Sequence, residues 1–170
     1  NNAYDIYQGI LKYDPENTRA AQGIKRIADI YLALAQSAKR RNDLTRSISL
    51  IELGLKVTPN HIALNEFQNV IINEIADNAE QENQSALKTQ IAQLFTQAKA
   101  YETASQLIKP VNQNAAEIYQ QILSLDQDNH QALHGLQKIA NQQVLLANEA
   151  INRNNAELAL DFVNEGLTFL

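Results

Sequence analysis

The chain contains no cysteine, methionine or tryptophan, and its 170 residues include only five glycines and three prolines. Without cysteine, disulfide bonds, thiolate metal sites and a cysteine nucleophile are excluded. So few glycines and prolines leave little room for the tight reversals that a sheet protein of this size needs. Alanine, leucine, glutamine, glutamate and asparagine are abundant instead. This composition predicts an all-α protein with long helices.

Long hydrophobic runs are missing as well. No apolar stretch approaches the roughly 18 residues that a membrane-spanning helix needs, so we expect no direct insertion of this segment into a membrane. The formal net charge is −5, and no clustered basic face is predicted, which argues against nucleic acid as a partner. Because the chain has no methionine, we expect it to be a processed product or a segment of a longer protein.

The sequence repeats itself over a long period. Residues 2–58 (the first copy) lie over residues 114–170 (the second copy) without a gap, so that NAYDIYQGIL returns as NAAEIYQQIL. Identical pairs run along the whole alignment, among them Ile6 and Ile118, Tyr7 and Tyr119, Ile10 and Ile122, Gly23 and Gly135, Ala35 and Ala147, and Gly54 and Gly166. Such a duplication is typical of a repeat architecture.

In each copy the apolar residues recur at intervals of three and four, which indicates amphipathic helices. Asn42 and Asp43 provide a short polar turn and an N-cap, so the helices on either side are expected to form an antiparallel hairpin. The predicted helices span residues 2–13, 17–41, 43–57, 114–125, 129–153 and 155–170. The predicted organisation is a first repeat unit at 1–60, a helical connecting segment at 61–112 and a second repeat unit at 113–170.

The connecting stretch contains neither glycine nor proline between residues 60 and 109, which permits a largely helical connection. Two apolar stripes occupy it, and they do not share a phase. The first consists of Leu64, Phe67, Ile71 and Ile75, and the second of Leu87, Ile91, Leu94, Ala98 and Tyr101. A turn near residues 80–84, which would make another hairpin, is the preferred interpretation. One long helix with a shifting apolar face is the alternative.

The first copy resembles a tetratricopeptide (TPR) repeat, a pattern of about 34 residues. Counted back from the closing Pro59, the pattern falls on Tyr31, Leu34, Ala35, Ala38, Ser47, Ile51 and Gly54. The small residues Ala35, Ser47 and Gly54 stand where two helices of such a repeat cross, because little side-chain bulk allows a close approach. The resemblance implies an elongated array of antiparallel helical hairpins, a TPR-like α-solenoid.

Three stretches between residues 91 and 140 also resemble repeats of bacterial cell-envelope and membrane-anchored multidomain proteins. They are IAQLFTQAKA, LIKPVNQNAAEIYQQILSLDQDN and LHGLQKIA. This resemblance implies a bacterial protein with a periplasmic or other extracytoplasmic location. It also keeps open the alternative that the segment is a spacer or sensor attached to an enzyme elsewhere in a longer chain.

Candidate catalytic groups are few. His130 and His134 are four residues apart at the start of a predicted helix, but the first copy has Thr18 and Gln22 in their places, and a zinc site would need further close ligands. No phosphate-binding loop, zinc-protease motif, nucleophile elbow or catalytic triad is recognisable. We therefore expect no enzyme activity, no cofactor and no metal.

The leading hypothesis is a non-catalytic scaffold that binds a peptide or partner protein on the concave face of the helical repeats, as TPR-like modules do. The family's groove positions fall on Asp29, Leu32, Gln36, Lys39 and Arg40 in the first copy, and on Asn141, Val144, Asn148, Ile151 and Asn152 in the second. Lys39 and Arg40 would pair with carboxylates, and the amides would form neutral hydrogen bonds. The rival hypothesis is a self-assembling structural protein that stacks end to end as a homo-oligomer.

Overall fold

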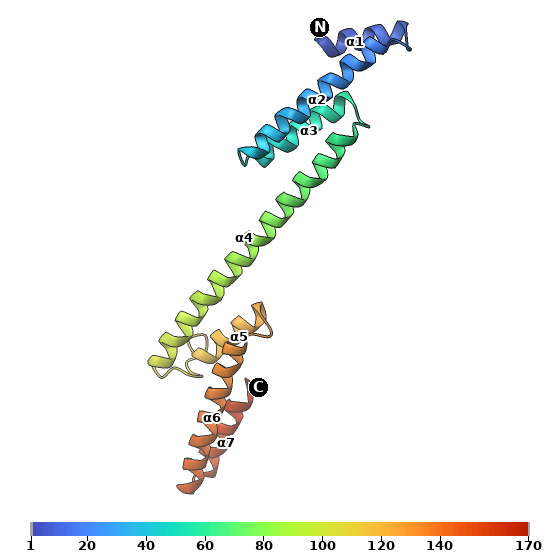
Figure 1. Cartoon of the computed structure of the whole chain (residues 1–170). Coiled ribbons are helices and arrows are strands. Elements are labelled where there is room, and N and C mark those ends of the chain that lie inside the picture. The colour runs from blue at the N-terminus through green and yellow to red at the C-terminus, as the bar shows by residue number, and fades with distance from the viewer. Residues whose placement is uncertain (1, 170) are drawn as a thin grey trace. The chain divides into compact units, whose positions relative to one another are not determined.

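The computed structural model describes residues 2–169 (Figure 1). All regular structure in this range is α-helical, as the composition predicts. The helices are α1 (Ala3–Tyr13), α2 (Thr18–Arg40), α3 (Leu44–Val57), α4 (Ile62–Thr103), α5 (Ala115–Leu125), α6 (His130–Asn152) and α7 (Ala156–Leu167). The six helices predicted within the two copies are confirmed, with ends that agree to within a few residues.

Each helix of the two copies begins at an asparagine or aspartate that caps it. The capping Oδ1 atom accepts a hydrogen bond of 2.9–3.1 Å from the backbone N–H three residues later. The caps are Asn2, Asn17 and Asp43 in the first copy, and their counterparts Asn114, Asn129 and Asn155 in the second. Each stabilises its helix by roughly 1 kcal/mol. Asn42 and Asn154 have φ values of 59° and 57°, a left-handed conformation that asparagine tolerates.

The chain divides into two compact units, Asn1–Glu82 and Asn83–Leu170, which are called the first and the second unit below. In the first unit α2 packs along α3, and α1 contacts α2 (Figure 1). In the second unit α6 packs along α7, and α5 contacts α6. Helix α4 contributes its beginning to the core of the first unit and its end to the core of the second.

The paired helices of the first unit approach each other over residues with little or no side chain. Ala35 on α2 is fully buried, and the hydroxyl of Ser47 on α3 donates a hydrogen bond of 3.0 Å to its carbonyl. A Cβ atom on Gly54 would lie 2.7 Å from Leu64 Cδ1 and 2.9 Å from Tyr31 Cβ. Glycine at this position therefore lets α2, α3 and the beginning of α4 meet at one point.

The predicted turn near residues 80–84 is wrong, because α4 continues through this stretch. Residues 76–90 are exposed on every side, so no core contact fixes a bend there, and they are rich in residues with high helix propensity. The two apolar stripes differ in phase because they pack into different cores. Ile71 is buried in the core of the first unit and Ala98 in that of the second.

Replacing Gly54 with alanine is expected to destabilise the first unit, since the new Cβ would press on Tyr31 and Leu64. Overpacking of this kind costs about 1–3 kcal/mol, against the gain of about 1 kcal/mol that alanine has over glycine in a helix. Gly9→Ala is the matched control, because nothing lies within 4 Å of the position of its Cβ. Thermal unfolding followed by circular dichroism should show a midpoint below that of the unaltered protein for Gly54→Ala but not for Gly9→Ala. Equal midpoints would contradict the close packing.

Replacing Asn83 with proline is expected to reduce the helical signal in circular dichroism without lowering the unfolding midpoint. Proline breaks the helix, but no core contact depends on the exposed stretch around residue 83. Ala98→Pro is the contrasting variant on the same helix, because Ala98 is fully buried in the second unit, and it should unfold that unit. A large drop in the midpoint of Asn83→Pro would show that the exposed stretch supports the cores.

Candidate functional site

The ten residues predicted to bind a partner lie on α2 and α6, and none of them is buried. The α2 face consists of Asp29, Leu32, Gln36, Lys39 and Arg40, and the α6 face of Asn141, Val144, Asn148, Ile151 and Asn152. Most of the steps within each set are three or four residues, so each set occupies one side of its helix. The two faces are counterparts in the repeat, and their surroundings differ.

The beginning of α4 covers part of the α2 face. Asp29 Oδ1 lies 2.9 Å from Nε2 of His61, the buried residue just before α4. Lys39 Nζ lies 2.7 Å from Glu74 Oε2, on α4 itself. Leu32 packs against the core of the first unit. Three of the five predicted residues therefore already have partners within this unit, and sequence reasoning missed those partners because they are far away along the chain.

Within residues 2–169 no element covers the α6 face. Val144 and Ile151 are 55% and 58% exposed, and the three asparagines of the face are exposed too. Asn141 accepts a hydrogen bond of 3.2 Å from Gln137 in the same helix. Two exposed aliphatic side chains flanked by amides suit the apolar side of a partner helix, with neutral hydrogen bonds at its edges.

An apolar pocket borders the α6 face at the place that corresponds to the Leu64 site of the first unit. In the first unit Leu64 is completely buried and lies against Gly54. In the second unit the counterpart glycine, Gly166, borders an open pocket of about 90 Å³. The lining residues are Ala140, Gln143, Val144, Phe162, Val163, Gly166 and Leu167. The pocket therefore offers an aliphatic side chain an apolar site that is continuous with Val144.

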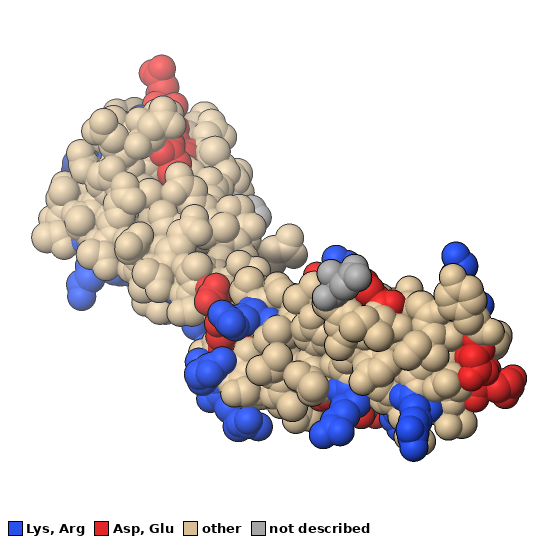
Figure 2. All heavy atoms as spheres, turned by 90° about the horizontal axis from the view of Figure 1, so that it is seen from above, with Lys and Arg blue, Asp and Glu red and all other residues tan. Residues whose placement is uncertain are grey.

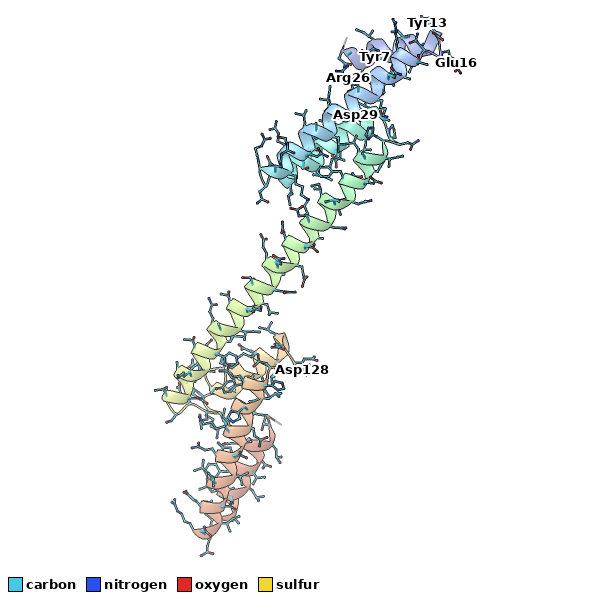
Figure 3. The ribbon with its side chains drawn as sticks, in the orientation of Figure 1. Tyr7, Tyr13, Glu16, Arg26, Asp29 and Asp128 are labelled. Atoms are coloured by element: carbon cyan, nitrogen blue, oxygen red, sulfur yellow. The ribbon has the colours of Figure 1, made fainter. Side chains whose placement is uncertain are left out.

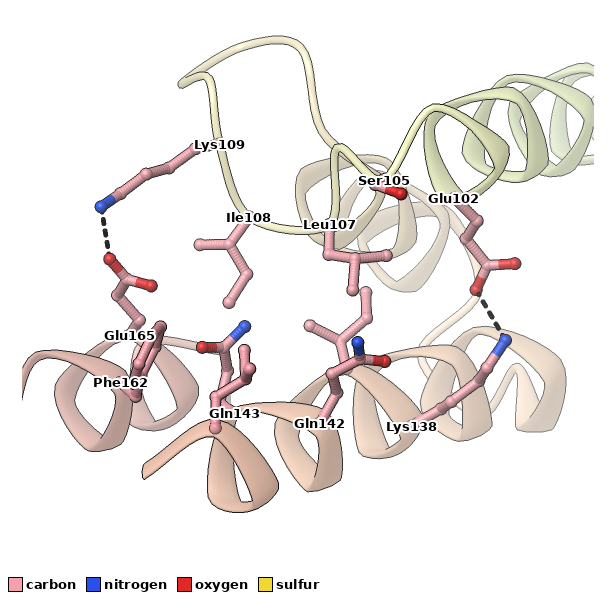
Figure 4. A pocket seen from close by; sticks show the side chains of 12 residues that line it. Glu102, Ser105, Leu107, Ile108, Lys109, Lys138, Gln142, Gln143, Phe162 and Glu165 are labelled. Carbon is pink, nitrogen blue, oxygen red and sulfur yellow. Dashed lines mark ion pairs between the residues drawn. The ribbon is translucent and has the colours of Figure 1, made fainter. Parts of the chain in front are cut away.

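A larger cavity, of about 470 Å³, lies in the second unit between the segment that follows α4 and the helices α6 and α7 (Figure 4). Leu107 and Ile108 point from that segment toward the helices. The lining residues are Glu102, Ser105, Leu107, Ile108, Lys109, Lys138, Ile139, Gln142, Gln143, Leu146, Phe162 and Glu165. The buried Oε1 atom of Gln143 has no hydrogen-bond donor among the residues that the structure describes.

Ion pairs stand at both ends of this cavity (Figure 4). Lys109 pairs with Glu165, and the hydrogen bond and negative charge of that carboxylate raise the pKa of Lys109. Glu102 Oε1 lies 3.5 Å from Lys138 Nζ and accepts a hydrogen bond of 3.2 Å from the hydroxyl of Tyr119. Burial, together with the charge of Glu102, raises the pKa of Tyr119 to about 12. These contacts hold the end of α4 and the following segment against α5, α6 and α7.

The side chains that line the two pockets are mostly uncharged. The side chains around both pockets are aliphatic, aromatic, amide, hydroxyl or ion-paired, and uncharged residues cover most of the surface in view in Figure 2. Within residues 2–169 no group of three or more histidines or acidic residues is placed to hold a metal ion, and His130 and His134 are both exposed. No helix in the same range is long and apolar enough to cross a membrane.

The chain matches no model of a known protein family, no curated protein and no solved structure. Its two copies nevertheless serve as comparisons for each other, because corresponding surfaces are covered in one unit and open in the other. The pocket beside Gly166 is the feature that sequence reasoning missed, although a glycine within a predicted helix is the signal that marks it.

The raised pKa of Tyr119 predicts that the protein loses stability at high pH. Its pKa in the folded protein is about 12, against an ordinary 10.0, so folding holds the phenol proton more tightly. The resulting stabilisation is complete below about pH 10 and is lost as the pH rises toward 12. Tyr119→Phe cannot ionise and should lose less stability between about pH 9 and 11 in urea unfolding. Tyr13→Phe is the control, because Tyr13 is 90% exposed, and a pH dependence common to both variants would contradict the assignment.

Proposed function

We propose that the protein is a non-catalytic scaffold for protein–protein interaction that binds an amphipathic helix of a partner on the α6 face. One observation carries this proposal. The corresponding α2 face of the first copy is partly covered by a helix, whereas the α6 face exposes Val144 and Ile151 and borders an apolar pocket. A surface whose counterpart receives a helix is suited to receive one as well.

The first unit indicates the chemistry of the partner helix. Leu64, Phe67 and Ile71 are three and four residues apart, and they carry the apolar side of α4 into the core of that unit. A partner of the α6 face would present the same spacing, with the residue that corresponds to Leu64 in the pocket beside Gly166.

The second unit also differs from the first in a way that bears on specificity. Lys39, which pairs with Glu74 of α4, is replaced by Ile151, and Asp29, which pairs with His61, is replaced by Asn141. A carboxylate at the position of Glu74 would lose hydration over an aliphatic side chain without gaining a cation. The partner helix is therefore apolar at that position.

We also propose that the paired helices belong to a TPR-like α-solenoid of antiparallel hairpins. The packing of α2 along α3 and of α6 along α7 supports this arrangement, as do the small residues between them. In such an array each hairpin buries its faces against neighbouring elements, so an uncovered hairpin face is a surface for a partner.

The test is a titration of a labelled peptide of residues 61–75 into the full chain, followed by fluorescence anisotropy. We expect the peptide with Glu74→Leu to bind more tightly than the native peptide, because Ile151 faces that position. Val144→Asp in the full chain should weaken binding about tenfold, since a buried carboxylate would need desolvation without a partner. Leu160→Asp is the matched control, because Leu160 is exposed but lines neither pocket.

Binding that is the same in Val144→Asp, Leu160→Asp and the unaltered protein would contradict the proposal. The second candidate function, end-to-end self-assembly, is favoured by the exposure of Leu158, Leu160 and Leu167 on α7. Light scattering over a concentration series distinguishes the two functions. A molar mass constant near 19.0 kDa supports the binding scaffold, and a mass that grows with concentration supports self-assembly.

A further inference from the structure

Identical residues of α1 and α5 differ sharply in exposure. Ile6 is 56% exposed, whereas its counterpart Ile118 is 5% exposed, and Ile10 is 38% exposed where Ile122 is fully buried. In the second unit these positions are covered by residues 91–109, the end of α4 and the segment after it, called the covering segment here. No part of the first unit provides an equivalent cover among the residues that the structure describes.

The surface beneath the missing cover has the same geometry as the covered one. In both copies a tyrosine ring packs on a glycine where two helices cross. A Cβ atom on Gly23 would lie 2.5 Å from the ring of Tyr7, and one on Gly135 would lie 2.5 Å from the ring of Tyr119. The crossing of α1 with α2 therefore presents its side chains as the crossing of α5 with α6 does.

The two residues that contact Glu102 of the covering segment have polar counterparts in the first unit. Glu102 receives a hydrogen bond from Tyr119 and pairs with Lys138. The counterparts of these two residues are Tyr7 and Arg26, which Figure 3 labels near the crossing of α1 and α2. Within residues 2–169 neither side chain has a hydrogen-bond or ion-pair partner. A carboxylate placed as Glu102 is would satisfy both.

The backbone N–H groups at the start of α1 and of α5 also differ in whether they have acceptors. The carbonyls of Gln106 and Leu107 accept hydrogen bonds of 2.9 and 3.0 Å from the first two N–H groups of α5. The corresponding N–H groups in the first unit belong to Ala3 and Tyr4 at the start of α1, and in the described part of the chain no acceptor faces them. An extended strand of backbone can therefore dock there as it does in the second unit.

The apolar contacts differ between the copies in one informative respect. Ile30 replaces Gln142, and Leu53 replaces Glu165, the residue with which Lys109 of the covering segment pairs. Ile30 and Leu53 are both exposed in the first unit. An occupant of this surface would thus be aliphatic where the covering segment has Lys109, because Leu53 offers that cation no carboxylate.

We propose that a second docking surface for a segment from outside residues 2–169 is formed by six residues of α1, α2 and the adjoining α3, called the α1–α2 face: Ile6, Tyr7, Ile10, Arg26, Ile30 and Leu53. The segment is an amphipathic helix with a glutamate in its last turn, followed by an extended stretch with aliphatic residues in place of Leu107, Ile108 and Lys109. The covering segment of a second copy is not the occupant, because its residues, including the fully buried Ala98, are already engaged in that copy's own second unit. This surface lies in the other unit from the α6 face, so the two sites are tested separately.

The probe is a labelled peptide of residues 87–111 that carries Lys109→Leu, titrated into the full chain. Arg26→Glu should weaken binding about tenfold, because it replaces an attractive charge with a repulsive one opposite Glu102. A second peptide with Glu102→Arg should recover most of that loss when it is paired with Arg26→Glu. Lys25→Glu is the matched control, because Lys25 is the neighbouring exposed cation and lines a different cavity, beside Asp29 and His61.

A further variant tests the specificity at Lys109. Leu53→Glu restores the carboxylate of the second unit, so it should reverse the preference in favour of the peptide with native Lys109. Equal effects of Arg26→Glu and Lys25→Glu, or no recovery by charge reversal, would overturn the proposal even if helix binding on the α6 face is found. A molar mass that grows with concentration and returns to one chain in Arg26→Glu would make a second copy the occupant and would also overturn it.

Discussion

Each unit depends on how closely two helices can approach over residues that have little or no side chain. Ala35 and Gly54 allow α2, α3 and the beginning of α4 to meet, and Gly23 accepts the ring of Tyr7 at the crossing with α1. A pair of helices this thin has two broad sides and no interior of its own beyond the line of contact. Both sides therefore expose apolar side chains unless another element covers them.

Helix α4 supplies such a cover to each unit, and it does so from opposite ends. Its beginning lies against the α2 face of the first unit, and its end, with the residues that follow, lies against α5 and α6 in the second. Among residues 2–169, each unit is consequently covered on one side only. The two uncovered sides, the α6 face and the α1–α2 face, are the surfaces to which we assign partners.

The assigned partners would imitate the protein's own internal packing, yet the two faces are chemically different. The α6 face offers amides and aliphatic side chains without charge, so shape and burial would determine what binds there. The α1–α2 face adds Arg26 and the hydroxyl of Tyr7, so it would select a carboxylate at one defined point. The exchange of Glu165 for Leu53 further distinguishes the α1–α2 face from its covered counterpart in the second unit, where Glu165 pairs with Lys109.

The sequence predicts the helices well because their signals are local. Capping asparagines, the left-handed Asn42 and small residues at helix contacts can all be recognised without knowing the rest of the fold. The continuity of α4 was missed for a physical reason. A change of phase between two apolar stripes was interpreted as a turn, but it arises because one helix enters two cores.

The ion pairs and hydrogen bonds of the α2 face could not be predicted from the sequence either. Asp29 with His61 and Lys39 with Glu74 join residues that only the folded first unit brings together. The positions of the α6 face could be predicted, but its openness could not, because exposure depends on which neighbouring elements are present. The openness of the α6 face can be recognised by comparing the two copies once the structure shows that α4 covers the corresponding α2 face.

The exposed middle of α4 has a consequence for how this protein can change during evolution. Side chains at residues 76–90 touch no core, so substitutions there are limited chiefly by helix propensity and solubility. Natural selection can therefore alter the charge or the hydrophilic character of this stretch without disturbing either unit. The residues on which folding depends and those free to drift are separated along a single continuous helix.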